Sequence, residues 1–468
     1  EVVQPLGVRK YEIIAGKGFY LNGEKYPMYG VCRHQDWWGL GSALKNENHD
    51  FDLAQIMDVG ATTVRFAHYQ QSDYLYSRCD SLGLIVWAEI PFVNRVTGYE
   101  AENAQSQLRE LIRQNFNHPS IYVWGLHNEV YHPHEYTSQL TAALHDLAKT
   151  EDPDRYTVSV NGYGHMEHPV NLNADIQGMN RYFGWYEKKI QDIDAWVEGL
   201  EEKYPYEKLM LSEYGADANI YHQTEYLGQS LNWTKPYYPE TFQTKTHEYQ
   251  WSVIARHPYI IASYLWNMFD FGCAARSEGG VTGRNNKGLV TMDRKIKKDS
   301  FYLYKAYWNP EPMVHICDKR YSLRSGENTQ IRVYTNQERV TLFVNGEEMA
   351  VNEVKRHVAS FPISLSGGKN AILVKAGDVW DAVTIDRVEK EPESYVFPEA
   401  SEREEGVANW FQEVGSLNLS EEMKYPEDRY HIRCTLEEIS ENDEAMELVT
   451  KAMKLITGMT IAKEEGMW

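Results

Sequence analysis

Two short apolar runs that each end in a glutamate constrain this chain more than any other feature. Residues 121–129 read IYVWGLHNE and residues 208–213 read KLMLSE. Bounded apolar runs of this length are typical of strands buried on both faces of a parallel sheet. A carboxylate at the tip of such a strand costs folding free energy unless it has a partner. The two glutamates are either members of unrelated structural ion pairs or, as we favour, an acid/base and a nucleophile on a barrel rim.

Strand-like and helix-like segments alternate from residue 28 to about residue 308. Helical patterns include residues 50–59, 105–117, 134–150 and 244–256. Candidate strands begin near residues 28, 61, 84, 120, 156, 174, 208 and 259. This alternation predicts an α/β fold, a (β/α)8 TIM barrel. Asn22-Gly23 predicts a hairpin turn before the barrel.

The pattern changes after residues 309–312, which read NPEP. Short alternating runs at 329–334, 339–344, 358–363 and 371–376 predict a small antiparallel β-sandwich. From residue 389 the chain is acidic, with helical patterns at 400–414 and 444–456. We expect three parts: a catalytic barrel (1–310), an immunoglobulin-like β-sandwich (311–388) and a mixed α/β C-terminal extension of unknown role (389–468).

Composition limits the partners and the compartment. A net charge of −21 argues against nucleic acid and anionic membranes as partners. No apolar run approaches the roughly 18 residues of a membrane helix, and residues 1–7 show no signal peptide. The five cysteines are scattered and favour reduced thiols, so we expect a cytoplasmic protein. The sequence does not begin with Met, so preceding segments stay open.

The two glutamates predict two distinct catalytic roles in the hydrolysis of a glycoside. Asn128 is placed to bond a sugar 2-hydroxyl, a contact that tightens in an oxocarbenium-like transition state. Glu129 then protonates the leaving oxygen, and Glu213 forms a glycosyl-enzyme ester that water later opens. A mechanism that retains configuration needs the two carboxyls about 5 Å apart.

Further polar and aromatic side chains follow the ends of other predicted strands. Because the carboxyl ends of barrel strands share one face, these groups are candidates for substrate binding. Glu89 either pairs with Arg65 as a structural salt bridge or joins the site. The candidates are His34, Asp36, Arg65, His68, Tyr182, Tyr186 and Trp266.

These motifs resemble glycoside hydrolase family 2, the group of β-galactosidases, β-glucuronidases and β-mannosidases. The resemblance is carried by Asn128-Glu129 and by residues 30–36 (GVCRHQD), 64–69 (VRFAHY), 117–121 (NHPSI) and 212–215 (SEYG). It implies that Glu129 is the acid/base, that Glu213 is the nucleophile and that Tyr182 bonds the nucleophile. It also implies a retaining exo-glycosidase that acts on a small-molecule or oligosaccharide glycoside and forms a homo-oligomer.

The resemblance narrows the substrate class. Residues 180–186 (NRYFGWY) and 266–271 (WNMFDF) are similar to bacterial β-glucuronidases, and Asn285-Asn286-Lys287 fits their Asn-x-Lys pattern. An Asn amide and a Lys ammonium on one loop, with Tyr186 as a third donor, suit the C6 carboxylate of a glucuronide. Lys287 as an exposed loop lysine, and a β-galactosidase with the same two glutamates, stay open as alternatives.

Departures from the family pattern bear on domains and cofactors. Members normally carry a jelly-roll and an immunoglobulin-like domain before the barrel, whereas here the barrel begins almost at residue 1. Galactosidases of the family use magnesium near the acid/base, but beside Glu89 we find no full ligand set and predict no metal. The sandwich and the tail resemble C-terminal extensions of some gut-bacterial members. Similarity to a subset of clostridial glucuronidases with such extensions makes an accessory flavin mononucleotide (FMN) conceivable, although no phosphate-cradling glycine loop supports it and catalysis needs none.

Two rival classes of protein fit the sequence less well. A non-catalytic carbohydrate-binding barrel is expected to have lost one carboxylate, and both are present. A metal-dependent hydrolase on this barrel needs clustered histidines such as His-x-His after the first strand, which His34-Gln35-Asp36 does not supply.

Overall fold

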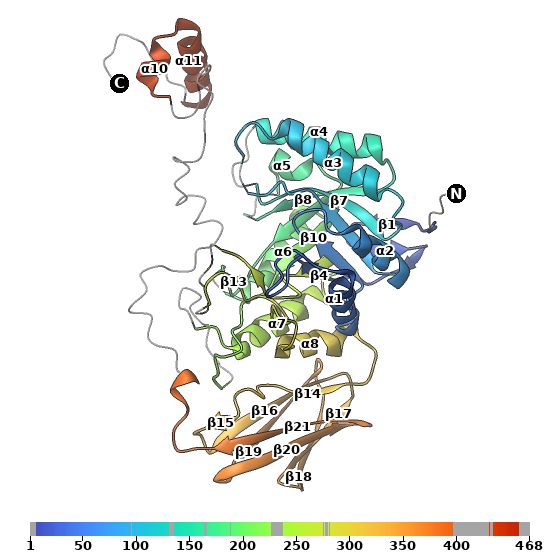
Figure 1. The fold of residues 1–468 in the computed structure, drawn as a ribbon, viewed down its shortest axis with the longest axis vertical. Helices are drawn as coiled ribbons and strands as arrows, with labels where there is room; N and C mark the ends of the chain where they lie inside the picture. The colour runs from blue at the N-terminus through green and yellow to red at the C-terminus, as the bar shows by residue number, and fades with distance from the viewer. Residues whose placement is uncertain are drawn as a thin grey trace. The chain divides into compact units, whose positions relative to one another are not determined.

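Eight parallel strands close into a barrel in the computed structural model of this protein (Figure 1). They neighbour one another in the order β10-β11-β4-β5-β6-β7-β8-β9. Each begins within two residues of its predicted start, so the expected TIM barrel is confirmed. Their bounds are β4 Tyr29–Arg33, β5 Thr63–Phe66, β6 Ile85–Glu89, β7 Ile121–Asn128, β8 Tyr156–Asn161, β9 Ile176–Asn180, β10 Leu209–Tyr214 and β11 Ile260–Leu265.

Burial on both faces explains why these strands read as continuous apolar runs. All residues of β7 and β10 are buried, including the two strands' polar tips. Helices on the outside and side-chain layers on the inside leave neither face to water. Polar side chains on such strands therefore need partners within the protein.

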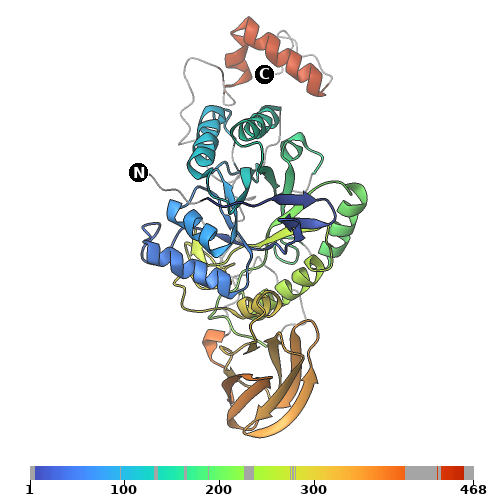
Figure 2. The same ribbon diagram turned by 90° about the vertical axis from the view of Figure 1, so that its right-hand side faces the viewer.

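Helices surround the barrel strands, as Figure 2 shows. The predicted helical segments correspond to α1, α3, α4 and α7. In α3, Ala104, Leu108, Leu111 and Ile112 are buried at helical spacing, which fixes the face that meets the barrel. The helices are α1 Asn46–Asp58, α2 Asp73–Leu82, α3 Ala101–Asn115, α4 Glu135–Glu151, α5 Pro169–Leu172, α6 Asp192–Lys203, α7 Glu240–Ile254 and α8 Asp299–Trp308.

An N-terminal hairpin covers the end of the barrel where the strands begin (Figure 2). It consists of β1 (Tyr11–Ile14), β2 (Gly18–Leu21) and the short β3 (Glu24–Lys25). Asn22 and Gly23 both have positive φ, as the predicted tight turn requires. Phe19 packs edge-on against Tyr122 near the start of β7, with ring centroids 5.5 Å apart. The candidate active site lies at the opposite end of the barrel.

A β-sandwich follows the barrel. Its two sheets have the strand orders β14-β16-β19 and β15-β21-β20-β17-β18. The four predicted runs correspond to β16, β17, β19 and β20, while the other four strands were not predicted; β18 is a largely exposed edge strand without apolar alternation. The strands are β14 Val314–Ile316, β15 Leu323–Arg324, β16 Asn328–Thr335, β17 Arg339–Val344, β18 Glu347–Glu353, β19 Val358–Ser364, β20 Gly368–Ala376 and β21 Val379–Arg387.

The chain forms two compact units, residues 1–410 and 411–468. The second contains α10 (Leu436–Ser440) and α11 (Asp443–Thr457), and α11 matches the helix expected at 444–456. The helix expected at 400–414 lies outside the described residues.

No helix in the described part of the chain is both long enough and apolar enough to cross a membrane. The structure describes residues 6–94, 96–130, 135–162, 166–187, 189–225, 237–274, 276, 279, 281–395, 430 and 434–457.

A buried ion cluster joins the first barrel strand to α1 and to the segment before α8. Asp52 of α1 is fully buried and accepts from Arg33 of β4, with Nη2 to Oδ2 at 2.8 Å. Arg294 donates to the other oxygen, with Nε to Oδ1 at 2.9 Å. Removing Asp52 would leave two guanidinium groups buried without their shared counter-ion.

We expect Asp52→Ala to lower the free energy of unfolding by about 3–5 kcal/mol, the usual cost of breaking a buried ion pair. Asp50→Ala on the same helix is the matched control, because Asp50 pairs with Arg78 at an exposed site. Urea unfolding of both variants measures the difference. Equal losses in the two variants would contradict the assigned role of the buried cluster.

Candidate active site

Predicted catalytic and substrate-binding residues meet at the carboxyl ends of the barrel strands, here called the rim. Arg65 lies in β5, Asn128 ends β7, Glu129 follows it, and Glu213 lies near the end of β10. All four are buried; Arg65 donates to Glu213 and Asn128, and Asn180 donates to both Asn128 and Glu129. The structure therefore brings together residues that strand-end reasoning had grouped.

Arg65 joins Glu89, Glu213 and Asn128 through one guanidinium. Its Nε and Nη2 donate to the two oxygens of Glu89 at 2.9 and 3.0 Å, and Nη1 donates to Glu213 Oε1 at 2.9 Å. Nη2 also donates to Asn128 Oδ1 at 2.8 Å. Burial alone would lower the pKa of Arg65, but the charges of Glu89 and Glu213 outweigh it and raise the pKa. The salt bridge to Glu89 is present, and it is part of the site.

Glu213 is held at both carboxylate oxygens. Arg65 donates to Oε1, and the hydroxyl of Tyr182 donates to Oε2 at 2.7 Å. Burial raises the pKa of Glu213, the Arg65 charge opposes the rise, and the negative charge of Glu129 adds to it. Burial and the Glu213 charge raise the pKa of Tyr182 well above its ordinary value, so this hydroxyl stays a donor.

Glu129 occupies an unusual backbone position. Its φ is +52°, in the left-handed region that residues other than glycine rarely adopt. Asn180 at the end of β9 donates from Nδ2 to Glu129 Oε1 at 2.9 Å, and its own Oδ1 accepts from Ser212 at 2.7 Å. A Cβ at Gly162 would lie 2.7 Å from Glu129 Oε1, so the carboxylate needs a glycine there.

An aromatic and imidazole layer borders the carboxylates. Trp266 stacks on His68 with ring centroids 5.0 Å apart, and His68 Nδ1 lies 2.6 Å from Glu89 Oε1. His34 meets Trp266 edge-on at 5.3 Å, and burial lowers its pKa well below the ordinary value. His34 is therefore neutral near pH 7. The three predicted residues form one continuous surface.

Asp36 has a different set of partners. Its Oδ2 accepts from the backbone N–H of Gly272 at 2.7 Å, and its carbonyl accepts from Arg294. Burial raises the pKa of Asp36. These bonds tie the loop after β4 to the loop that begins at Phe271.

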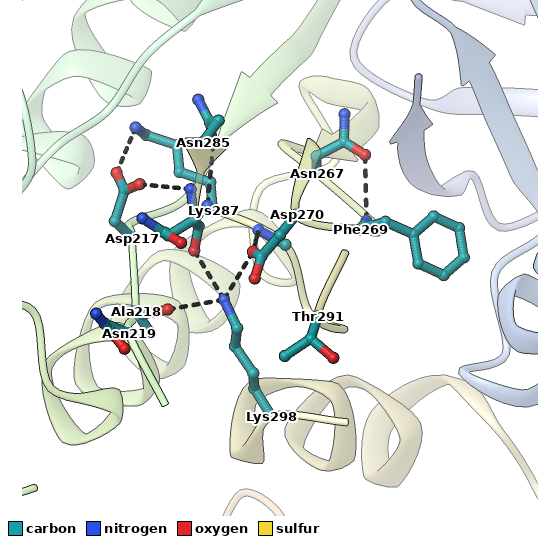
Figure 3. A network of polar contacts seen from close by, with 12 residues as sticks. Asp217, Ala218, Asn219, Asn267, Phe269, Asp270, Asn285, Lys287, Thr291 and Lys298 are labelled. Atoms are coloured by element: carbon teal, nitrogen blue, oxygen red, sulfur yellow. Dashed lines mark hydrogen bonds and ion pairs between the residues drawn. The ribbon is translucent and has the colours of Figure 1, made fainter. Parts of the chain in front are cut away.

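A second group of residues, the basic cluster, consists of Tyr186, Arg276, Asn285 and Lys287. Lys287 is 1% exposed, so the alternative of an exposed loop lysine is wrong. Its Nζ pairs with Asp217, as Figure 3 shows. The same Nζ donates to the Tyr186 hydroxyl at 2.7 Å. Arg276 Nη1 donates to the same hydroxyl at 2.9 Å. Asn285 Oδ1 accepts from the backbone of Lys287 at 3.0 Å.

The basic cluster adjoins the residues that hold Glu213. Lys287 Nζ lies 5.8 Å from the ring centroid of Tyr182, whose hydroxyl bonds Glu213. It lies 4.6 Å from the ring centroid of Tyr186, and those two tyrosine rings meet edge-on at 5.1 Å. The predicted catalytic and substrate-binding tyrosines thus connect the two groups.

Asn180, Asp217 and Arg276 are contributors that the sequence prediction missed. Asn180 ends β9, so the strand-end argument would have identified it. Asp217 follows β10 as closely as Asp36 follows β4, whereas Arg276 lies farther along a rim loop. Their partners are 70 and 90 residues away. No local pattern marks such contacts.

Asp270 lies behind the basic cluster, and its pKa is raised above the ordinary value. It is 2% exposed, and its Oδ1 accepts from Lys298 Nζ at 2.8 Å and from Gly288 N–H at 2.9 Å. Burial raises the pKa of Asp270 to about 6, although the charge of Lys298 opposes the rise. The folded protein therefore favours the protonated carboxyl more than the unfolded chain does.

Family comparison assigns the two parts of the first unit. Residues 13–311 match the model for the glycosyl hydrolases family 2 TIM barrel domain. Residues 326–379, within the sandwich, match a domain of unknown function.

Similar proteins include β-glucuronidases and a putative β-galactosidase. The chain is 40% identical over 413 residues to a β-glucuronidase of Bacteroides fragilis, covering 84% of this chain and 58% of that relative. A crystal structure of a putative β-galactosidase from Bacteroides fragilis is 70% identical, with a TM-score of 0.80, and covers 82% of this chain and 58% of that one. An FMN-binding β-glucuronidase from Facaelibacterium prausnitzii L2-6 is 42% identical, with a TM-score of 0.80, and covers 84% and 61%.

The raised pKa of Asp270 predicts how the effect of Asp270→Asn changes with pH. The stability contributed by the raised pKa is fully present below the ordinary value of 3.8 and is lost as the pH rises through about 6. The asparagine does not titrate, so we expect the substitution to cost less stability at pH 7.5 than at pH 4.5. Urea unfolding of both proteins at the two values measures this difference. A cost that grows with pH would contradict the assignment.

Proposed function

We propose that this chain, which belongs to glycosyl hydrolase family 2, acts as a retaining exo-β-glycosidase on terminal β-D-glucuronides. The chain spans 58% of the curated Bacteroides fragilis relative, so the proposal concerns the barrel and its rim. Two buried glutamates with different partners support the two roles of the reaction. The basic cluster beside them supports the choice of sugar.

In the first step, Glu213 attacks the anomeric carbon while Glu129 gives its proton to the glycosidic oxygen. The bond between the anomeric carbon and the Glu213 carboxylate forms, the glycosidic bond breaks and the aglycone leaves as its alcohol. Arg65 and Tyr182 hold the two oxygens of Glu213 before attack, which saves the cost of ordering the nucleophile in the transition state. The predicted carboxyl separation of about 5 Å belongs to this proposal.

In the second step, Glu129 takes a proton from water as the water attacks the anomeric carbon. The ester bond to Glu213 breaks, and the sugar leaves with its β-configuration retained. Asn180 keeps the Glu129 carboxylate in one orientation for both proton transfers. Asn128, held by Arg65, is placed for the 2-hydroxyl, and the ring of Trp266 offers an apolar face to the sugar.

The observation that carries the choice of glucuronide is the buried Lys287 ammonium beside Tyr182 and Tyr186. Its hydroxyl partner Tyr186 accepts from Lys287 and from Arg276, which orients the Tyr186 proton as a donor. A C6 carboxylate at this cluster meets two cations and a hydroxyl. Charge-assisted hydrogen bonds of this kind are worth about 1.5–3 kcal/mol each.

A β-galactosidase activity is the second candidate. Asp217 already pairs with Lys287, so the ammonium has a counter-charge before any substrate arrives. A neutral sugar would leave this pair undisturbed, whereas a carboxylate adds a further negative charge. The 70% identical structure described as a putative β-galactosidase supports the same alternative.

FMN, which one relative binds, has no step in this mechanism. The glycine-containing loop before α8 does not fit a phosphate, because its backbone donors already serve protein oxygens. Gly288 N–H donates to Asp270, and Asn286 N–H donates to Asp217. Both acceptors are carboxylates, which would repel a phosphate. An accessory flavin elsewhere on the protein stays a prediction.

Lys287→Met removes the ammonium and keeps the length of the side chain. We expect kcat/KM for 4-nitrophenyl β-D-glucuronide to fall about tenfold to a hundredfold, the equivalent of one charge-assisted hydrogen bond. The loss for 4-nitrophenyl β-D-galactoside should be much smaller. Assays of both substrates with wild type and variant measure this.

Lys295→Met is the control for a lost lysine, because Lys295 is exposed on a nearby loop. It should leave both activities unchanged. Equal losses on the two sugars in Lys287→Met would contradict the carboxylate role. Wild-type preference for the galactoside would favour the second candidate.

A further inference from the structure

The basic cluster is fixed from behind by a fully buried lysine, Lys298. Its Nζ donates to the carbonyls of Ala218 and Asn286 and to Asp270 Oδ1, each at 2.8 Å (Figure 3). An ammonium has three protons, and these three acceptors use them all. Lys298 is 0% exposed, so water cannot replace any of the three bonds.

The three acceptors belong to three rim segments that are distant in sequence. Ala218 follows β10, Asp270 follows β11, and Asn286 adjoins Lys287. The segments are also bonded directly to one another: Ala218 N–H donates to Asn286 O at 3.0 Å, and Asn267 N–H donates to Lys287 O at 3.2 Å. Lys298 is thus one of three donors that hold the backbone at Asn286 and Lys287.

The next residue, Asp299, belongs to a different network. It begins α8, and its carboxylate contacts the sandwich: Oδ1 lies 2.8 Å from His315 Nε2, and Oδ2 accepts from Asp318 N–H at 2.7 Å. Burial opposes ionisation of Asp299, but His315 and Arg320 lower the pKa to about 2, so the carboxylate is charged. One peptide bond separates this interface from the lysine behind the basic cluster.

Arg320 of the sandwich segment completes the connection. Its Nε donates to Glu240 Oε2 at 2.6 Å, and Glu240 Oε1 accepts from Asp299 N–H at 2.9 Å. Glu240 and Asp299 are the first residues of α7 and α8. Each helix follows a rim loop that supplies a residue to the Lys287–Asp217 pair. The sandwich therefore holds the starts of both helices.

We propose that the β-sandwich is a positioning element for the basic cluster, acting from Arg320 through Glu240 and Asp299 to Lys298. This gives the segment of the β-sandwich that contains His315, Asp318 and Arg320 a role in substrate selection, and that role rests on the proposed glucuronidase function. The chemistry is a chain of buried ion pairs and hydrogen bonds between distant segments. Arg320 and Lys298 are positioning residues that act through Lys287.

The test compares two sandwich arginines that both bind α7 carboxylates. Arg320→Gln breaks the pair with Glu240 at the start of α7. Arg332→Gln, the matched control, breaks the pair with Glu248 within the same helix. Hydrogen–deuterium exchange of the backbone amides of residues 286–288 measures how firmly this loop is held, without any substrate. KM and kcat for 4-nitrophenyl β-D-glucuronide measure the effect of a displaced loop on catalysis.

We expect Arg320→Gln to speed exchange at residues 286–288 about tenfold and to raise KM for the glucuronide, with kcat nearly unchanged. Arg332→Gln should lower the melting temperature and leave the exchange and KM as in wild type. Arg320→Lys keeps the charge and should recover most of the loss. Lys298→Met should produce the same exchange signature if it folds.

Unchanged exchange in Arg320→Gln would overturn the proposal, as would equal acceleration in both arginine variants. The Arg320 series decides the matter even if Lys298→Met fails to fold. A wild-type protein inactive on glucuronides would contradict the proposed function alone, because the exchange result still decides whether the sandwich positions the loop.

Discussion

The rim depends on one buried guanidinium. Arg65 is fully buried and must satisfy Glu89, Glu213 and Asn128 at once, so the ends of β5, β6, β7 and β10 cannot move independently. A buried charge that loses its partner costs several kcal/mol, which makes the arrangement all-or-none. The orientation of Glu213 is therefore built into the folded barrel before any substrate binds.

The same rule governs the rest of the rim. Two buried lysines each pair with a carboxylate: Lys287 with Asp217, and Lys298 with Asp270. The low dielectric of the interior makes these pairs strong and makes an unpaired member costly. Under the proposed function, a glucuronide competes with Asp217 for Lys287, and Arg276, which donates to the Tyr186 hydroxyl, adds a second cation to the cluster.

The sequence predicted those parts of the site that the chain's own regularity dictates. Parallel strands bring their carboxyl ends to one face, so Glu129, Glu213 and Arg65 could be placed together from their positions alone. The eight strand starts followed from bounded apolar runs. Exposed strands such as β18 have no such pattern and were missed.

Contacts between loops could not be predicted in this way. Lys298 lies 80 residues from its partner Ala218, and nothing near it in sequence indicates that it is buried. Asp217 and Arg276 were missed for the same reason. Lys287 was recognised only through a resemblance, and its burial and counter-ion came from the structure.

The most direct test of this account is covalent labelling of the nucleophile. A cyclophellitol aziridine that carries a C6 carboxylate would be incubated with the purified protein beside its neutral galactose-configured counterpart, and the adduct mapped by mass spectrometry of peptides. The account predicts one adduct, on Glu213, formed faster with the carboxylate probe and absent in Glu213→Gln. An adduct on another residue, or equal labelling by the two probes, would contradict it.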